Sequence, residues 1–196
     1  AFTQNPGGVK LRYKLLAQDN PINLGGLRQD SQAAQNPFPG GPHFRDRLAD
    51  EGGLDLDTGR TKTPWQDARG KFLGPAGMDV AWDDDQGGLF HRTLEDNSVK
   101  LLALPDAKDF SDAAAKARER FSFLQRSTEG ASPAKQCRFF AVLTSQRNLA
   151  VIEVSEFSSA AATISWSLGR VHAQAGGVSV EPIKRLLEVD ASAEAV

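Results

Sequence analysis

Proline and glycine are concentrated in the first 78 residues of this 196-residue chain, and they limit how much regular structure can form there. That stretch holds 12 of the 18 glycines and 7 of the 10 prolines. Proline ends helices, and both residue types weaken strand ladders. Only residues 9–17 (VKLRYKLLA) have the composition of a short strand or helix. We therefore predict that residues 1–78 form an extended arm, with less than about a fifth of its residues in regular structure.

The apolar residues of this arm come singly, so the arm cannot close a core of its own. Buried aromatic anchors carry much of the binding energy in protein interfaces. We therefore expect the arm to dock on another protein through the aromatic side chains of Phe38, Phe44, Trp65 and Phe72. The simpler alternative is an arm that wraps over its own domain.

Residues 79–136 have the pattern of a small β-rich segment followed by a helix. Apolar residues recur every three or four positions between Phe110 and Leu124, which predicts an amphipathic helix. The side chain of Asp109 or Ser111 can cap its first turn. Before the helix, short apolar runs between turn residues predict three strands, at 80–82, 89–93 and 98–104.

Residues 137–196 have the pattern of a compact unit with a C-terminal tail. Two runs rich in aromatic and branched residues, 137–144 and 149–155, predict an antiparallel hairpin. The spacing of apolar residues over 157–171 then predicts a helix, and a last strand is expected at 178–183.

The predicted helix over 157–171 should pack on the hairpin. Gly176-Gly177 would end this helix, because glycine enters the left-handed conformation of a C-cap without strain. Its apolar face should be buried against the strands, through the side chains of Phe157, Ile164, Leu168 and Val171. The order strand, strand, helix, strand indicates the α+β fold class, with helices packed on a small antiparallel sheet.

Few residues have the pattern of a catalytic or metal-binding site. The three histidines have no acid or cysteine at metal-ligand spacing, and the chain contains no phosphate-binding glycine loop. We interpret Asp83-Asp84-Asp85 as a solvated turn, because it lacks the spaced ligands of a calcium loop. The only cysteine, Cys137, lies in a predicted strand, where a buried structural thiol is expected. We therefore predict no catalytic residue, no metal and no cofactor.

The C-terminal unit resembles a known domain. A strand carrying Arg138, Phe139 and Phe140 opens it, a helix carrying Ile164, Leu168 and Val171 follows, and the sequence GGVSVEP (176–182) closes it. In these features residues 137–185 resemble the small linker domain of phycobilisome rod linkers and of the core cap linker.

This resemblance implies a non-catalytic subunit that organises a light-harvesting antenna. Arg138 and Phe139 would then contact phycobiliproteins, and the protein would lie next to the thylakoid, in the plastid stroma or the cyanobacterial cytoplasm. Residues 137–185 carry five basic and three acidic side chains, so they would be drawn to acidic partners.

Two other classes of function stay open. Aromatic residues beside cations, such as Trp65 near Arg69, are typical of single-stranded nucleic-acid binding, which would need an OB-like barrel over 79–185. The net charge of −2 argues against binding that depends mainly on phosphate contacts. The third class is an enzyme whose site is not visible in the sequence. A membrane-spanning helix is not expected, because no apolar run approaches about 18 residues.

Overall fold

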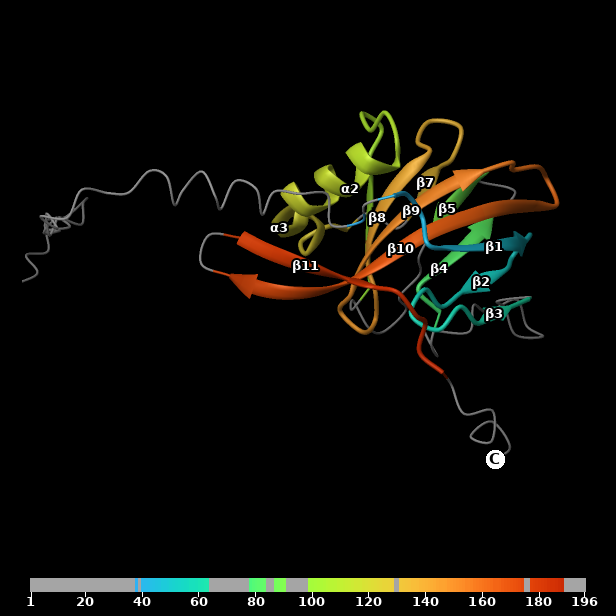
Figure 1. Ribbon diagram of the computed structural model, residues 1–196. Coiled ribbons are helices and arrows are strands. Elements are labelled where there is room, and N and C mark those ends of the chain that lie inside the picture. The colour runs from blue at the N-terminus through green and yellow to red at the C-terminus, as the bar shows by residue number, and fades with distance from the viewer. Residues whose placement is uncertain are drawn as a thin grey trace, which may run out of the picture. The chain divides into compact units, whose positions relative to one another are not determined.

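The computed structural model describes residues 38, 40–63, 78–83, 87–90, 99–128, 131–174 and 177–188. All of them belong to one compact unit, residues 34–196. The described strands of this unit form two antiparallel sheets, and two helices pack on the larger sheet (Figure 1). It therefore belongs among the folds that combine antiparallel sheets with few helices.

The larger sheet has the strand order β1-β10-β9-β8-β6, and β11 is also paired with β10. Its strands are β1 (Phe44–Ala49), β6 (Lys100–Ala103), β8 (Phe139–Leu143), β9 (Leu149–Ser155), β10 (Ala161–Gln174) and β11 (Gly177–Ile183). The smaller sheet has the order β3-β2-β4-β5-β7. Its strands are β2 (Gly53–Leu54), β3 (Thr61–Lys62), β4 (Val80–Asp83), β5 (Gly88–Phe90) and β7 (Ala131–Pro133).

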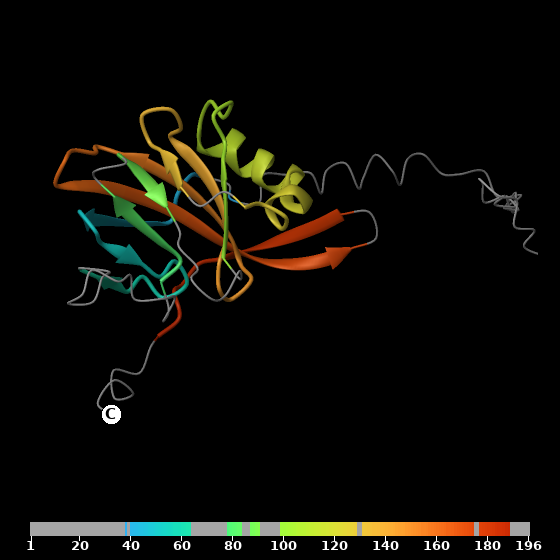
Figure 2. The ribbon, with the colours of Figure 1, turned by 180° about the vertical axis from the view of Figure 1, so that it is seen from behind.

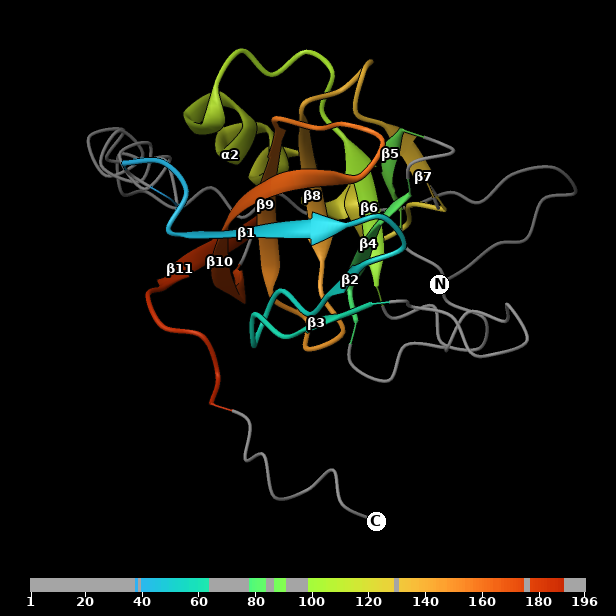
Figure 3. The same ribbon diagram turned by 90° about the vertical axis from the view of Figure 1, so that its right-hand side faces the viewer.

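The long strand β10 has two successive partners along one of its sides. Leu168 pairs with Ala150 of β9 and also with Ile183 of β11, so β11 must lie on the side of β10 that faces away from β9. β1 lies on that same side, where Phe44 is opposite Trp166. Figure 3 shows β1 running alongside β10. β1 and β11 therefore follow one another along the same side of β10.

The larger sheet is covered on both faces, and this explains why its central strands are apolar throughout. One face packs against the smaller sheet, where Trp82, Phe140 and Trp166 lie in a common core. The other face packs against the helices, where Phe139 and Phe110 are buried. All five residues of β8 are buried, because both of its faces are covered.

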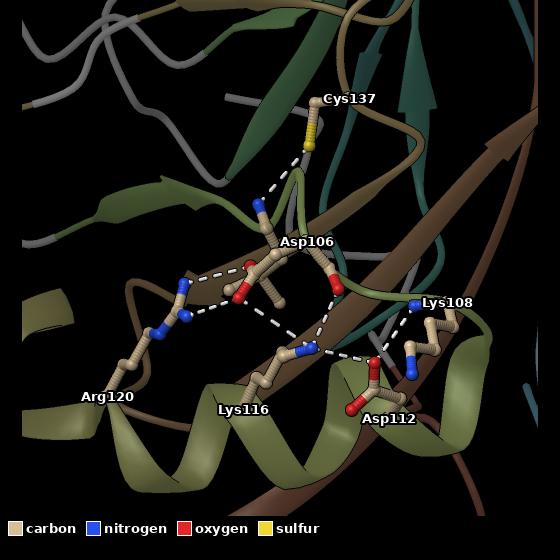
Figure 4. A network of polar contacts seen from close by, with 7 residues as sticks. Asp106, Lys108, Asp112, Lys116, Arg120 and Cys137 are labelled. Carbon is tan, nitrogen blue, oxygen red and sulfur yellow. Dashed lines mark hydrogen bonds and ion pairs between the residues drawn. The ribbon is translucent and has the colours of Figure 1, made fainter.

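The helices are α2 (Phe110–Glu119) and α3 (Phe121–Leu124). Asp109 caps α2, because its side chain accepts a hydrogen bond from the backbone N–H of Asp112 at 2.8 Å. Ion pairs hold the preceding loop on the helix (Figure 4). Arg120 donates two hydrogen bonds to the carboxylate of Asp106, and Lys116 bridges Asp106 and Asp112. Neither α2 nor α3 is long and apolar enough to cross a membrane.

Much of the pattern predicted for residues 79–155 is confirmed. The amphipathic stripe between Phe110 and Leu124 forms α2 and α3, and Asp109 is the cap. The predicted hairpin consists of β8 and β9, which pair antiparallel. β4, β5, β6 and β11 lie within one to three residues of the bounds predicted for four further strands.

The helix predicted over 157–171 is wrong, because this segment forms the strand β10. Its apolar residues fit both periods: Ala161, Ile164 and Leu168 follow a helical stripe, but Ile164, Trp166 and Leu168 alternate along one strand face. The small polar residues between them, on the other face of the strand, are also buried. The sequence therefore showed no exposed polar face that would have indicated a strand. Ile164 and Leu168 are buried as expected, whereas Phe157 is 38% exposed. Gly177 pairs with Gln174 at the start of β11 and caps no helix.

The predicted arm does not extend to residue 78, because residues 44–62 supply β1, β2 and β3 to the two sheets. Leu48 and Leu54 are buried in the core between the sheets. This part of the arm therefore belongs to its own domain, as the simpler alternative required. Residues 1–37, like residues 64–77, lie outside the described part of the chain.

Candidate metal centre

Three aspartates from two segments come together beside the smaller sheet. The sequence Asp55-Leu56-Asp57-Thr58-Gly59 forms the loop between β2 and β3, and Asp79 immediately precedes β4. β2 and β4 are antiparallel neighbours in which Leu54 is opposite Val80, so the pairing brings the two acidic ends together. One carboxylate oxygen from each aspartate lies within 4.8 Å of the others.

The fold of the β2–β3 loop is set by Asp55. Its Oδ1 accepts hydrogen bonds from the N–H groups of Asp57 (2.9 Å) and Thr58 (3.3 Å), and its Oδ2 accepts one from the Thr58 hydroxyl (2.6 Å). These contacts are typical of an Asx turn. Gly59 follows with a φ of +72°, a conformation that glycine adopts without a Cβ penalty. The loop therefore turns back on itself and directs its aspartates inward.

Asp79 links this loop to the turn between β8 and β9. One of its oxygens accepts a hydrogen bond from the Leu56 N–H (3.0 Å), and the other accepts one from the Ser145 N–H (2.8 Å). Asp79 is fully buried. The Asn148 amide, from the end of the same turn, donates to Oδ1 of Asp57 at 2.7 Å. Both sheets thus contribute to one polar site.

One oxygen of this site receives no hydrogen bond of normal geometry from the described residues. Asp57 is only 2% exposed, and its Oδ2 is buried without a hydrogen bond of normal geometry. Among the described residues, no lysine, arginine or histidine forms an ion pair with Asp55, Asp57 or Asp79. Buried carboxylates are normally paired with a cation or bound to a metal. Within the described part of the chain, the cluster therefore lacks the positive charge that such groups require.

The environment of the cluster disfavours negative charge. Burial is the main cause that raises the pKa of Asp79 to about 7, and the nearby carboxylates of Asp57 and Asp55 add to the effect. The N–H groups of Ser145 and Leu56 act in the opposite direction. Burial likewise raises the pKa of Asp57, against the opposing effect of the Asn148 and Thr144 side chains, and the nearby Asp55 carboxylate raises it further. A cation at this position would remove the repulsion and allow all three groups to be ionised.

The structure does not bring the site residues predicted from the sequence together at this cluster. Phe38 is fully buried in the core under the helices, and Phe139 is 3% exposed in the same core, so neither is an accessible anchor. Phe44 is partly buried and packs on Trp166. Arg138 is exposed and forms an ion pair with Glu153.

The other interpretations made from the sequence have different outcomes in the structure. Trp65, Phe72 and two of the three aspartates in 83–85 lie outside the described residues. Cys137 is a buried thiol, as predicted: Sγ accepts a hydrogen bond from the Leu104 N–H and donates one to the Phe139 carbonyl. The strands within 79–185 are divided between two sheets, which does not fit the OB-like barrel expected for a nucleic-acid binder.

The sequence patterns predicted no metal-ligating residue, so Asp55, Asp57 and Asp79 were missed. The local signal was the spacing Asp-x-Asp-x-Gly at 55–59, which places two carboxylates at alternate positions of a tight turn. The third aspartate has no local signal. It comes 22 residues after Asp57 and reaches the site only through the pairing of β2 with β4.

Comparisons with known proteins gave no match for this chain. No protein family, no curated protein and no solved structure was found to be similar to it. The phycobilisome-linker function implied by the resemblance therefore stays a prediction. Of the features that carry the resemblance, the structure keeps the strands β8, β9 and β11, but the helix among them is the strand β10.

Proposed function

We propose that this chain is a divalent-cation-binding domain, in which Asp55, Asp57 and Asp79 hold one Ca²⁺ ion. The observation that carries the proposal is the buried Oδ2 of Asp57, which receives no hydrogen bond of normal geometry from a described residue and belongs to a group of three carboxylates. An oxygen in this situation costs free energy unless a cation or a donor reaches it. A bound cation would supply the missing interaction.

The chemistry of the site favours Ca²⁺ over Mg²⁺. All the atoms that the three aspartates offer to a metal ion are oxygens, which are the ligands that both Ca²⁺ and Mg²⁺ prefer. Ca²⁺ binds carboxylates as monodentate or bidentate ligands in a flexible geometry, whereas Mg²⁺ usually keeps several bound waters. The three aspartates are 0–7% exposed, so a site among them has little room for those waters. The ligands from the protein therefore have to complete most of the coordination shell.

The ion would have a structural role. The β2–β3 loop already contacts three other parts of the domain, through the Trp166 indole (to the Leu56 carbonyl), through Asn148, and through the Leu187 N–H (to the Asp57 carbonyl). A cation in the cluster would fasten this loop to the β8–β9 turn. Carboxylates buried to this degree are not accessible to a substrate, which favours a closed, non-catalytic site.

Calcium titration of the purified chain after EDTA treatment tests the proposal. Isothermal titration calorimetry should give one site per chain, and thermal unfolding should shift upward with calcium. At a free Ca²⁺ concentration 100 times the Kd, the expected stabilisation is about 2.7 kcal/mol. Mg²⁺ at the same concentration should give a smaller shift.

Asp57→Asn separates a metal site from a simple hydrogen-bond network. In EDTA this variant should be at least as stable as the wild type, because it removes a charge from a crowded, buried cluster. It should also lose the response to calcium. Glu119→Gln, on the exposed surface of α2, is the matched control and should respond like the wild type. A wild type that gains no stability from Ca²⁺, Mg²⁺ or Mn²⁺ would refute the proposal.

A further inference from the structure

A groove of about 450 Å³ lies along the β10–β11 hairpin. The hairpin runs out beyond the rest of the larger sheet (Figure 2), and residues 170 and 172–174 of β10 are exposed. The groove is lined by Arg170 of β10, by Glu181, Pro182 and Ile183 of β11, and by Lys184 and Arg185 just after it. Three of these six side chains are cations, and one is an acid.

The positive charge of the groove is not neutralised within the described part of the chain. Arg170, Lys184 and Arg185 are exposed, and none of them forms an ion pair with a described residue. Arg170 is opposite Glu181 in the β10–β11 register, but the Glu181 carboxylate instead lies 3.3 Å from Nε2 of His172. The groove therefore attracts anionic groups.

The groove borders an edge of the sheet. Among the described strands, β11 pairs with β10 alone. Proline has no N–H to donate. Pro182 therefore costs the β10–β11 ladder no hydrogen bond only if its nitrogen points away from β10, toward the outer edge of β11. By the alternation of a strand, Val180 and Val178 then direct their backbone N–H and C=O groups outward as well. An extended chain could pair with these groups.

We propose that the outer edge of β11 binds an extended acidic peptide segment of a partner protein by strand addition. The backbone of β11 would supply the pairing, and Arg170, Lys184 and Arg185 would select acidic side chains. A second copy of this chain fits less well, because its β11 edge would bring the same cations. A nucleic acid would use the cations but not the strand edge. The inference does not depend on the cation site and would stand if that site held no ion.

Fluorescence anisotropy with labelled ten-residue peptides tests this inference on the full chain. The probe alternates Glu and Val, and two controls replace either Val by Pro or Glu by Lys. The Glu-Pro peptide has the same charge but cannot form a ladder, so it should bind at least about tenfold more weakly. The Lys-Val peptide should not bind. Equal binding of the Glu-Val and Glu-Pro peptides would overturn strand addition.

Charge variants test the groove itself. Exposed ion pairs are individually weak, so the triple variant R170Q/K184Q/R185Q should lose about tenfold in affinity for the Glu-Val peptide. The matched control K62Q/R126Q/K135Q removes three exposed cations that do not line the groove and should lose less than about threefold. Equal losses in the two variants would refute the site. So would tighter binding of a single-stranded oligonucleotide than of the peptide.

If the groove variant fails to fold, the salt dependence of the wild type provides the test. Its affinity for the Glu-Val peptide must weaken between 50 and 300 mM salt, or the inference fails.

Discussion

The buried aspartates make a specific prediction about how stability depends on pH when no divalent cation is present. The pKa of Asp79 is about 7 in the folded protein, against 3.8 in an exposed aspartate. The folded state therefore binds more protons than the unfolded state between these two values. It follows that stability is greatest below pH 3.8 for this group and is lost as the pH rises toward 7.

The size of the effect follows from the two pKa values. Each pH unit between them costs up to ~1.4 kcal/mol, so raising the pH from 5 to 8 should lower the free energy of unfolding by roughly 3 kcal/mol. Asp57 acts in the same direction, because burial raises its pKa too. Asp106 and Asp112 have lowered pKa values, through their hydrogen bonds from Arg120 and Lys116, and their effect is confined to more acidic solutions.

Urea unfolding at pH 5 and pH 8 in EDTA, on the wild type and on Asp79→Asn, measures this effect. The absolute stability of the variant is not informative, because Asn accepts only one of the two N–H bonds that Asp79 accepts. The difference between the two pH values is informative, and it should shrink by roughly 3 kcal/mol in the variant. Saturating Ca²⁺ should also reduce it in the wild type. Equal pH dependence of the two proteins in EDTA would refute this account of Asp79.

Three further predictions concern the sheets and their core. Ile164→Ala should cost about 2–4 kcal/mol in urea unfolding, because Ile164 is fully buried, and Val171→Ala, at a half-buried position, should cost less than half as much. Gly169→Ala should cost at least about 1 kcal/mol, because the added Cβ would overlap the Val180 side chain of β11, whereas Gly177→Ala has free space and should change stability by less than about 0.5 kcal/mol. The Cys137 thiol should react with a thiol reagent only when the protein unfolds, and a fast reaction in native buffer would contradict its burial.

Local patterns in the sequence predicted the elements whose environment is simple. α2 has one buried and one exposed face, so its stripe of apolar residues was readable. β9 was predicted with its observed bounds, Leu149–Ser155, because branched residues fill it and turns flank it. β10 was missed because both of its faces are buried as far as Gly169. A strand of this kind has no polar side, and its apolar residues then fit a helical spacing equally well.

The candidate metal site could not be predicted from local sequence patterns, for a different reason. Asp55 and Asp57 are close in sequence, but a pair of aspartates in a turn is usually solvated. What makes them unusual is burial beneath the β8–β9 turn and the arrival of Asp79 from the neighbouring strand. Both depend on the pairing of strands distant in sequence, which a single sequence does not reveal.

The position of β1 on the side of β10 also determines when the larger sheet can be completed on a ribosome. His43, just before β1, bonds to Ser167 of β10, 124 residues later in the chain. At about 5–20 residues per second, the partner of β1 is made roughly 6 to 25 s after β1 itself. β8, β9, β10 and β11, by contrast, are consecutive neighbours and can pair as soon as each is made. During synthesis, β1 and its apolar side chains Phe44 and Leu48 therefore stay without their sheet partner for this interval, and an unpaired strand can associate with other chains.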